Sequence, residues 1–208
     1  MAVKRRTSTY RQEQAAATRN RIASAARKLF RERGYGATTL AAIAAEAGVA
    51  EPTVYAVFGS KKGFLHALRQ QMHAEVELRK LTKEAKAAPT ARLKLEGWAR
   101  LLRRQMEQSY DVIAVHREAA RVDSAAAQEY RGVLDSRAGV MEELVEELAS
   151  GLKADLELKT ATDILWAFSN EEIYRELVHE RGWSPDRYER WVSRTLKQQL
   201  LADEDVCE

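Results

Sequence analysis

The chain has 208 residues, of which 45% are hydrophobic, 31% charged and 7% aromatic, with only 10 glycines and 3 prolines. This length and composition suit a globular protein that is rich in helix and has few turns. A single cysteine excludes a disulfide framework and a cysteine-rich metal site. The longest uncharged run, residues 34–45, is too short to span a bilayer, and no apolar segment follows the basic start. We therefore expect a cytoplasmic protein that does not bind a membrane.

The net charge of +3 is divided unevenly along the chain. Residues 1–62 hold 12 Lys and Arg against 4 Asp and Glu, a net +8, whereas residues 63–208 hold 22 against 27, a net −5. A basic segment joined to an acidic one indicates a polyanionic partner for the first. The alternative is a tail that only increases solubility, because part of the positive charge falls in residues 1–14, which we expect to be a basic disordered arm.

Helical periodicity begins after this arm. Between residues 15 and 33 apolar side chains recur every three or four positions, which predicts an amphipathic helix. Thr38 and Thr39 then precede a short second helix, because a threonine hydroxyl is a good N-cap, and Gly48 ends that helix. A third short helix is expected over residues 51–58.

Two helices of about two turns each are poorly stable alone and need their neighbours. Joined by the tight turn at residues 47–49, they fit a helix-turn-helix, whose second helix enters the major groove of DNA. The outer face of residues 50–57 is then free for a partner. Lys61 and Lys62 start the next helix, where positive side chains and free N–H groups bind phosphate. The alternative is an ordinary helical pair with solvated charges.

The rest of the chain also has helical periodicity and no strand pattern, so the predicted class is all-α with about nine helices. The last helix should begin at Ser184 as N-cap, with Pro185 in its first turn. The other predicted elements are a long fourth helix over 60–85, a link at 83–90, separate fifth and sixth helices near 93–106 and 112–120, a helix ending near residue 151, and an apolar segment over 161–178 whose phase slips near residue 170.

One set of residues within 19–65 carries a resemblance to a known family: Arg21-Ile22, Ala25-Ala26, Leu29-Phe30, Gly34-Tyr35, Thr38-Thr39, Ile43-Ala44, Ala47-Gly48-Val49, Thr53-Val54-Tyr55, Phe58 and Lys61. Without insertion or gap, this run resembles the N-terminal domain of tetracycline-repressor (TetR) family regulators. The segment 182–191 is similar to the end of many family members. The resemblance implies a helix-turn-helix DNA-binding domain over 15–62 and a helical effector-binding and dimerisation domain over 63–208.

The resemblance also implies which residues hold the DNA backbone. Thr38 or Thr39 would bind a phosphate through its hydroxyl or backbone N–H, and Tyr55 would donate its hydroxyl to another. Lys61 would pair with a further phosphate from the start of the fourth helix, beside Lys62.

By the same resemblance Ala50, Glu51, Pro52 and Thr53 would face the bases. The chain departs here from a typical reader of sequence, because these side chains are small or acidic. Glu51 can accept from the amino group of cytosine, and Pro52 or the methyl of Thr53 can contact thymine. Glu51 is equally consistent with stabilising the start of the third helix.

Family members resembling this chain are homodimers, and the sequence itself has more apolar bulk near its end than two peripheral helices need. Part of this bulk must belong to the internal core. The residues expected at the dimer interface are Ile173, Leu177, Trp191, Val192 and Leu196.

An effector pocket is expected among the helices of the second domain, lined by aromatic surface with a few polar groups. An ordinary packed core is the alternative for each of these residues. The candidates are Trp98, Met106, Tyr110, His116, Trp166, Phe168, Asn170 and Tyr174.

These features predict a transcriptional repressor that binds a palindromic operator in double-stranded DNA and is released by a small-molecule effector. We expect no enzymatic activity, catalytic residue, metal or cofactor, since no nucleophile–base arrangement and no glycine-rich phosphate loop is present. The alternatives are a DNA-binding regulator controlled by a protein partner, and a helical ligand-binding protein that has lost DNA binding.

Overall fold

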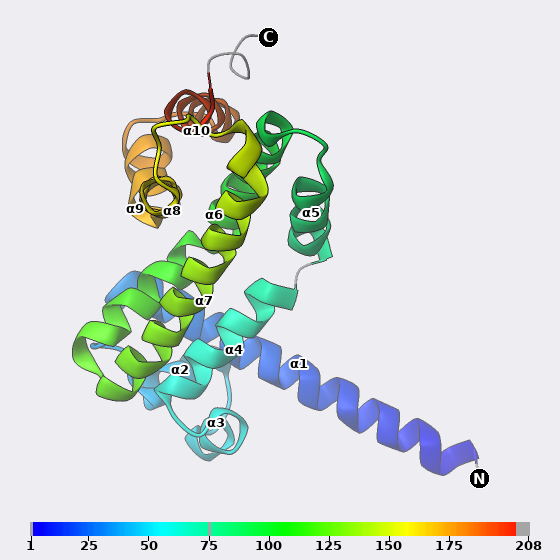
Figure 1. The fold of residues 1–208 in the computed structure, drawn as a ribbon. Coiled ribbons are helices and arrows are strands. Elements are labelled where there is room, and N and C mark those ends of the chain that lie inside the picture. Colours follow the sequence, from blue (N-terminus) through cyan, green and yellow to red (C-terminus); the bar gives the residue numbers. More distant parts are fainter. Residues whose placement is uncertain (1, 75, 203–208) are drawn as a thin grey trace. The chain divides into compact units, whose positions relative to one another are not determined.

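The computed structural model describes residues 2–74 and 76–202, with side chains described over 10–71 and 77–202. Over these residues every element is helical, and the one strand-like contact is an isolated bridge between Leu152 and Leu201 (Figure 1). The predicted all-α class is therefore confirmed. The helices are α1 (Ala2–Arg33), α2 (Leu40–Ala47), α3 (Glu51–Phe58), α4 (Lys61–Ala74), α5 (Val76–Ala87), α6 (Ala91–Val122), α7 (Ser124–Leu148), α8 (Leu158–Phe168), α9 (Glu171–Tyr174) and α10 (Pro185–Leu200), with a 3₁₀ turn at Ala149–Gly151 and a π-helical turn at Arg175–Glu180.

Two helices are longer than the sequence patterns indicated. The predicted fifth and sixth helices form the single helix α6, because residues 107–111 between them contain no glycine or proline to interrupt the backbone hydrogen bonds. The predicted disordered arm, residues 1–14, is instead helical from Ala2 onward as part of α1. Residues 2–33 likewise contain neither glycine nor proline.

The chain divides into two compact units. The first, here called the head, comprises residues 1–71 and 114–128, and the second, the body, comprises residues 72–113 and 129–208. The head thus takes in most of α4 and the corner where α6 meets α7, which the predicted division at residue 62 placed in the second domain. The helix α6 is continuous, but its first part belongs to the body and its last turns belong to the head.

The core of the head is small and aromatic. Phe58 and Phe64 stack with their ring centroids 4.1 Å apart, and Phe30 lies edge-on to Phe64 at 6.3 Å. Phe30 also contacts Tyr35 at 5.3 Å. These rings connect α1, the following turn, α3 and α4, so each short helix is held by its neighbours. The buried aliphatic side chains around them are Ile22, Leu29, Ile43, Val54, Leu65 and Leu68.

The core of the body is formed by one face each of α6, α7, α8 and α10. The buried face of α10 consists of Tyr188, Val192, Leu196 and Leu200, which are four residues apart and all fully buried. Among the described residues, no single helix is both long and apolar enough to cross a membrane, and only the bent pair α2 with α3 meets the length and composition limits jointly.

Candidate nucleic-acid interface

The helices α2 and α3 have the geometry of a helix-turn-helix. Thr39 caps α2 as predicted, with its Oγ1 accepting a hydrogen bond of 3.1 Å from the backbone N–H of Ala42. Gly48 follows α2 in the left-handed conformation, φ +64°, where other residues are strained. The two helices are bent by 107° relative to each other, within the range of about 90–120° for this motif.

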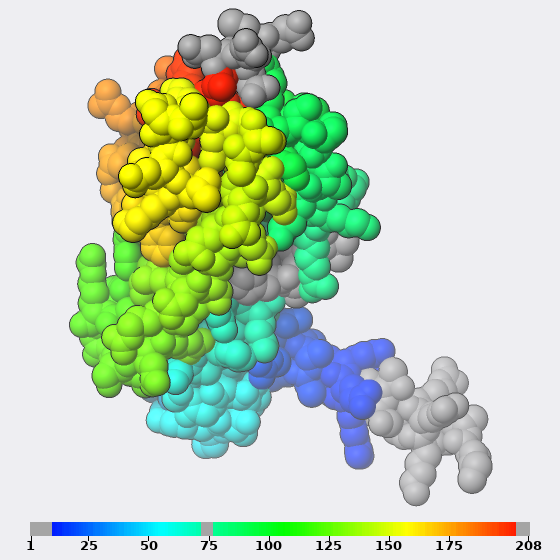
Figure 2. All heavy atoms as spheres, in the orientation of Figure 1, coloured from blue at the N-terminus to red at the C-terminus, as the bar shows by residue number. Residues whose placement is uncertain are grey.

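The outer face of α3 is open. Its inner side buries Val54 and Phe58, while Glu51, Pro52 and Tyr55 are exposed. In Figure 2 this helix lies in the cyan segment at the surface of the head. The structure therefore leaves these three predicted base- and phosphate-facing side chains of α3 accessible. The exposed residues at the start of this helix also include Ala50, and Thr53 is half-buried.

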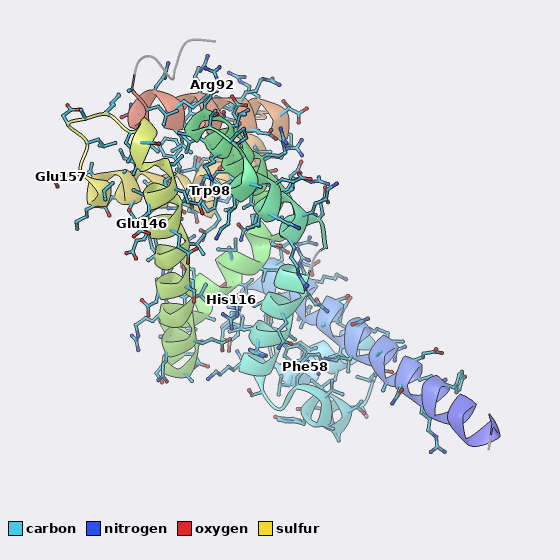
Figure 3. All side chains as sticks on the ribbon, turned by 45° about the vertical axis from the view of Figure 1, so that its right-hand side comes forward. Phe58, Arg92, Trp98, His116, Glu146 and Glu157 are labelled. Atoms are coloured by element: carbon cyan, nitrogen blue, oxygen red, sulfur yellow. The ribbon has the colours of Figure 1, made fainter. Side chains whose placement is uncertain are left out.

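Arg19 of α1, which the sequence did not single out, binds the C-terminal end of α3. Arg19 Nη1 donates to the carbonyl oxygen of Val57 over 3.1 Å, and its guanidinium lies 4.6 Å from the ring centroid of Phe58. Cations are favourable at a helix C-terminus because the last carbonyls are unpaired. Phe58 is labelled in Figure 3. The only signal in the sequence is a basic residue placed one turn before the apolar stripe of α1 begins.

The predicted phosphate-binding residues are not equivalent. Thr38 is buried, and its hydroxyl donates to the carbonyl oxygens of Gly34 and Leu29, at 2.8 and 3.3 Å. Its hydroxyl is therefore engaged within the turn, and a phosphate contact by Thr38 through its backbone N–H stays a prediction. Thr39 and Lys62 are exposed. Tyr55 is 52% exposed, so about half of this residue is accessible.

Lys61 also has a structural role that its position in the sequence did not indicate. Its Nζ donates to the carbonyl oxygens of Tyr35 and Gly36, at 2.9 and 3.3 Å, and lies 4.5 Å from the ring centroid of Tyr35. It thereby ties the start of α4 to the turn between α1 and α2. Any phosphate contact by Lys61 would be made alongside these bonds.

The corner between α6 and α7 supports the same turn from within the head. Asp123 accepts from the backbone N–H groups of Ala125 and Ala126, at 2.9 and 3.1 Å, and the Tyr35 hydroxyl donates to it at 3.5 Å. Hydrogen bonds to the carboxylate, chiefly from Ala126, lower the pKa of Asp123. Gly34 lies so close to Glu118 that a Cβ there would be 2.7 Å from Oε1. The last turns of α6 are therefore part of the head.

The residues predicted for an effector pocket do not form one cluster. His116 is buried in the head, whereas the other seven belong to the body; Trp98 and His116 are labelled in Figure 3. Trp98, Met106 and Tyr174 are buried in the core of the body. The Asn170 side chain caps α9 by accepting from the N–H of Glu172 at 3.0 Å. The half-buried candidates are Tyr110, Trp166, Phe168 and Asn170.

Two buried polar atoms that belong to residues of the hydrophobic core of the body have no hydrogen-bond partner among the described residues. They are the Trp98 Nε1 and the Tyr188 hydroxyl. Burial raises the pKa of Tyr188 and raises that of Tyr174 to about 12, so both phenols stay protonated at neutral pH. Buried donors are normally satisfied, so these two are candidate anchors for a ligand.

The predicted dimer interface is corrected in part. Val192 and Leu196 are fully buried inside the body of their own chain, because the face of α10 that carries them packs against α6 and α8. Ile173, Leu177 and Trp191 are only half-buried and lie at the edge of this core. Among the described residues, no group of three His, Cys, Asp or Glu side chains is placed to hold a metal ion.

Comparison with known proteins agrees with the resemblance seen in the sequence. Residues 22–68 match the model described as "Bacterial regulatory proteins, tetR family". No curated protein sequence matches the chain. Similar solved structures include NalD of Pseudomonas aeruginosa, the secondary repressor of the MexAB-OprM multidrug efflux pump (21% identity, 92% of this chain and 99% of that chain, TM-score 0.73). Others are FadR of Bacillus subtilis in complex with stearoyl-CoA (19%, 85% and 96%, 0.68) and a TetR/AcrR-family regulator of Thermobifida fusca (25%, 86% and 95%, 0.61).

Proposed function

We propose that this chain is a repressor of transcription and that a small-molecule effector releases it from a palindromic operator. The premise is that residues 22–68 are the amino-terminal domain of the tetR family of bacterial regulatory proteins. The observation that carries the DNA-binding part is the exposed face of α3, held at 107° to α2 by a left-handed glycine turn. The excess of basic residues over residues 1–62 supports the same function, because DNA affinity rests largely on phosphate neutralisation.

In this proposal two groups of residues have different tasks. The hydroxyl of Tyr55, the ammonium of Lys62 and the exposed Thr39 contact phosphates, which position the head without reading sequence. Glu51, with Ala50, Pro52 and Thr53 around it, faces the base edges. Glu51 also lies in the first turn of α3, where a carboxylate stabilises the helix. Substitutions separate these tasks.

Tyr55→Phe is expected to weaken binding to all duplexes by a similar factor, about tenfold or more, because a hydrogen bond to a charged group contributes about 1.5–3 kcal/mol. Glu51→Ala is expected to change the preference at one base pair, at a cost of about 1–3 kcal/mol for the preferred base. Selection of duplexes from a random pool, followed by mobility-shift titration, measures both effects. Equal loss of sequence preference in the two variants would contradict this division of tasks, and an unchanged preference with lower stability would make Glu51 a helix cap only.

The effector part of the proposal rests on the body. FadR of Bacillus subtilis, which has the same fold, was solved in complex with stearoyl-CoA. In this chain the half-buried Tyr110, Trp166 and Phe168 offer aromatic surface, and the unpartnered donors of Trp98 and Tyr188 offer hydrogen bonds to an acceptor group of a ligand. The effector must bind the DNA-incompetent arrangement more tightly, since a ligand without differential affinity shifts nothing.

The proposal includes a homodimer, because two α3 helices about one turn of DNA apart read a palindrome. With Val192 and Leu196 inside the core, the surface left for association includes Ile173, Leu177 and Trp191. The sedimentation of the Trp191→Ala variant should therefore be compared with that of wild type as a test of this association surface.

A further inference from the structure

Arg137 continues the row of buried side chains along α7. It precedes Met141 by one turn and Val145 by two, so the three residues share one face of the helix. Met141 and Val145 are buried and belong to the hydrophobic core of the body. Arg137 itself is half-buried. The core-facing row of α7 therefore carries a guanidinium at this end.

Trp166 of α8 holds this guanidinium in place. The Nη2 of Arg137 donates to the backbone carbonyl oxygen of Trp166 over 2.7 Å, and the guanidinium carbon lies 4.2 Å from the centroid of the indole ring. The carbonyl belongs to the last turn of α8, where a cation is favourable. Because the indole ring packs on one face of the planar guanidinium, its N–H edges have a fixed direction.

The rest of the guanidinium is not satisfied by this cap. Its Nε is buried and has no hydrogen-bond partner among the described residues. Arg137 also forms no ion pair with a carboxylate in the described part of the chain. Burial lowers the pKa of Arg137, and the attraction of Glu171 and then Tyr130 opposes this only in part. A helix cap accounts for one N–H group but leaves a buried donor without an acceptor, which is rare in proteins.

We propose that the N–H edge of Arg137 binds the carboxylate of an organic acid, so that the effector of the body is an acid with an apolar portion. This inference rests on the effector part of the function proposed above. A guanidinium can donate two parallel hydrogen bonds to one carboxylate. The bound anion would accept from the buried Nε and neutralise a charge that burial disfavours, while its apolar portion packs against Trp166, which itself lies against the core.

A pair of probes that differ in charge but not in chain length tests the site. Octanoate is ionised at neutral pH, and octanamide is its neutral analogue. Isothermal titration of the full-length protein without DNA measures both affinities. We expect octanoate to bind about tenfold more tightly or better, because hydrogen bonds between ionised groups are roughly twice as strong as neutral ones.

Substitutions of the chain assign this preference to one side chain. Arg137→Gln should abolish it, whereas Arg137→Lys should retain part of it, since lysine keeps the charge and a donor for the Trp166 carbonyl but lacks the fork of a guanidinium. Arg131→Gln is the matched control, because Arg131 is exposed on the same helix. Glu171→Gln should tighten the binding of octanoate and not that of octanamide, because it removes a negative charge that acts on Arg137.

Three results would overturn the proposal. They are no binding of octanoate, equal affinities for octanoate and octanamide in the wild-type protein, and a preference for octanoate that survives Arg137→Gln. Release of DNA is measured separately, by adding octanoate to the protein–DNA complex. Octanoate that binds through Arg137 without weakening that complex would contradict the effector role proposed for the body and leave the carboxylate site in place.

Discussion

Replacing Gly63 by alanine is expected to lower the DNA affinity of the head at least tenfold. Gly63 is the third residue of α4, and a Cβ at this position would lie 1.9 Å from the carbonyl oxygen of Phe58, the last residue of α3. That oxygen cannot simply move, because it accepts from the backbone N–H of Ser60 at 2.8 Å. The junction between α3 and α4 must therefore open, which carries α3 out of its position against α2.

The cost of this overpacking should be large. Inserting a methyl group where backbone must move destabilises a protein by about 3 kcal/mol, and the head has a small core with which to absorb it. We expect a lower midpoint of thermal unfolding and a loss of operator affinity of at least tenfold. Gly36→Ala is the matched control, since nothing lies within 4 Å of a Cβ there. Normal DNA binding by the Gly63→Ala variant would show that α3 is not held as the structure has it.

Leu196→Ala is expected to lower the free energy of unfolding of the body by about 3 kcal/mol, because a fully buried leucine loses its contacts and leaves a cavity. Leu196 lies on the face of α10 that packs into the core, together with Tyr188 and Val192. Urea unfolding followed by circular dichroism measures the change. DNA affinity per folded molecule should be unchanged, since the substitution lies outside the head.

Leu158→Ala provides the matched control for this prediction. Leu158 is 51% exposed at the start of α8, so the same truncation should cost no more than about 0.5 kcal/mol. Sedimentation distinguishes a core role from an interface role for Leu196. A variant of normal monomer stability that dissociates into monomers would contradict the burial of Leu196 and restore it to the dimer interface.

Local features of the sequence predicted the local structure well. Thr39 caps α2, Gly48 ends it in a left-handed conformation, and Ser184 caps α10 by accepting from the N–H of Arg187 at 3.2 Å. The phase slip near Asn170 is real, because that residue is the N-cap of a new helix, α9. Each of these depends on residues within one turn of the chain, so sequence spacing contains the necessary information.

Features that depend on the packing of distant segments were not predictable in the same way. Thr38 and Thr39 are adjacent threonines, yet only the folded turn shows that the hydroxyl of Thr38 points inward to Gly34 and Leu29. An apolar residue on an amphipathic helix can lie in the core of its own chain or at a dimer interface. The sequence therefore could not show which of the two contains Val192. His116 was grouped with Tyr110 as a candidate for one pocket, but α6 runs from the body into the head between them.

The central claim is that the head binds DNA through its basic surface, and the salt dependence of binding tests it most directly. Wild-type protein should be titrated by fluorescence anisotropy against duplex DNA from the region upstream of its own gene, at several salt concentrations. If Lys62 of each head in a dimer neutralises one phosphate, the affinity should fall about tenfold between 50 and 200 mM salt, and more steeply if other basic residues contribute. Absence of binding, or binding that does not weaken with salt, would contradict the account.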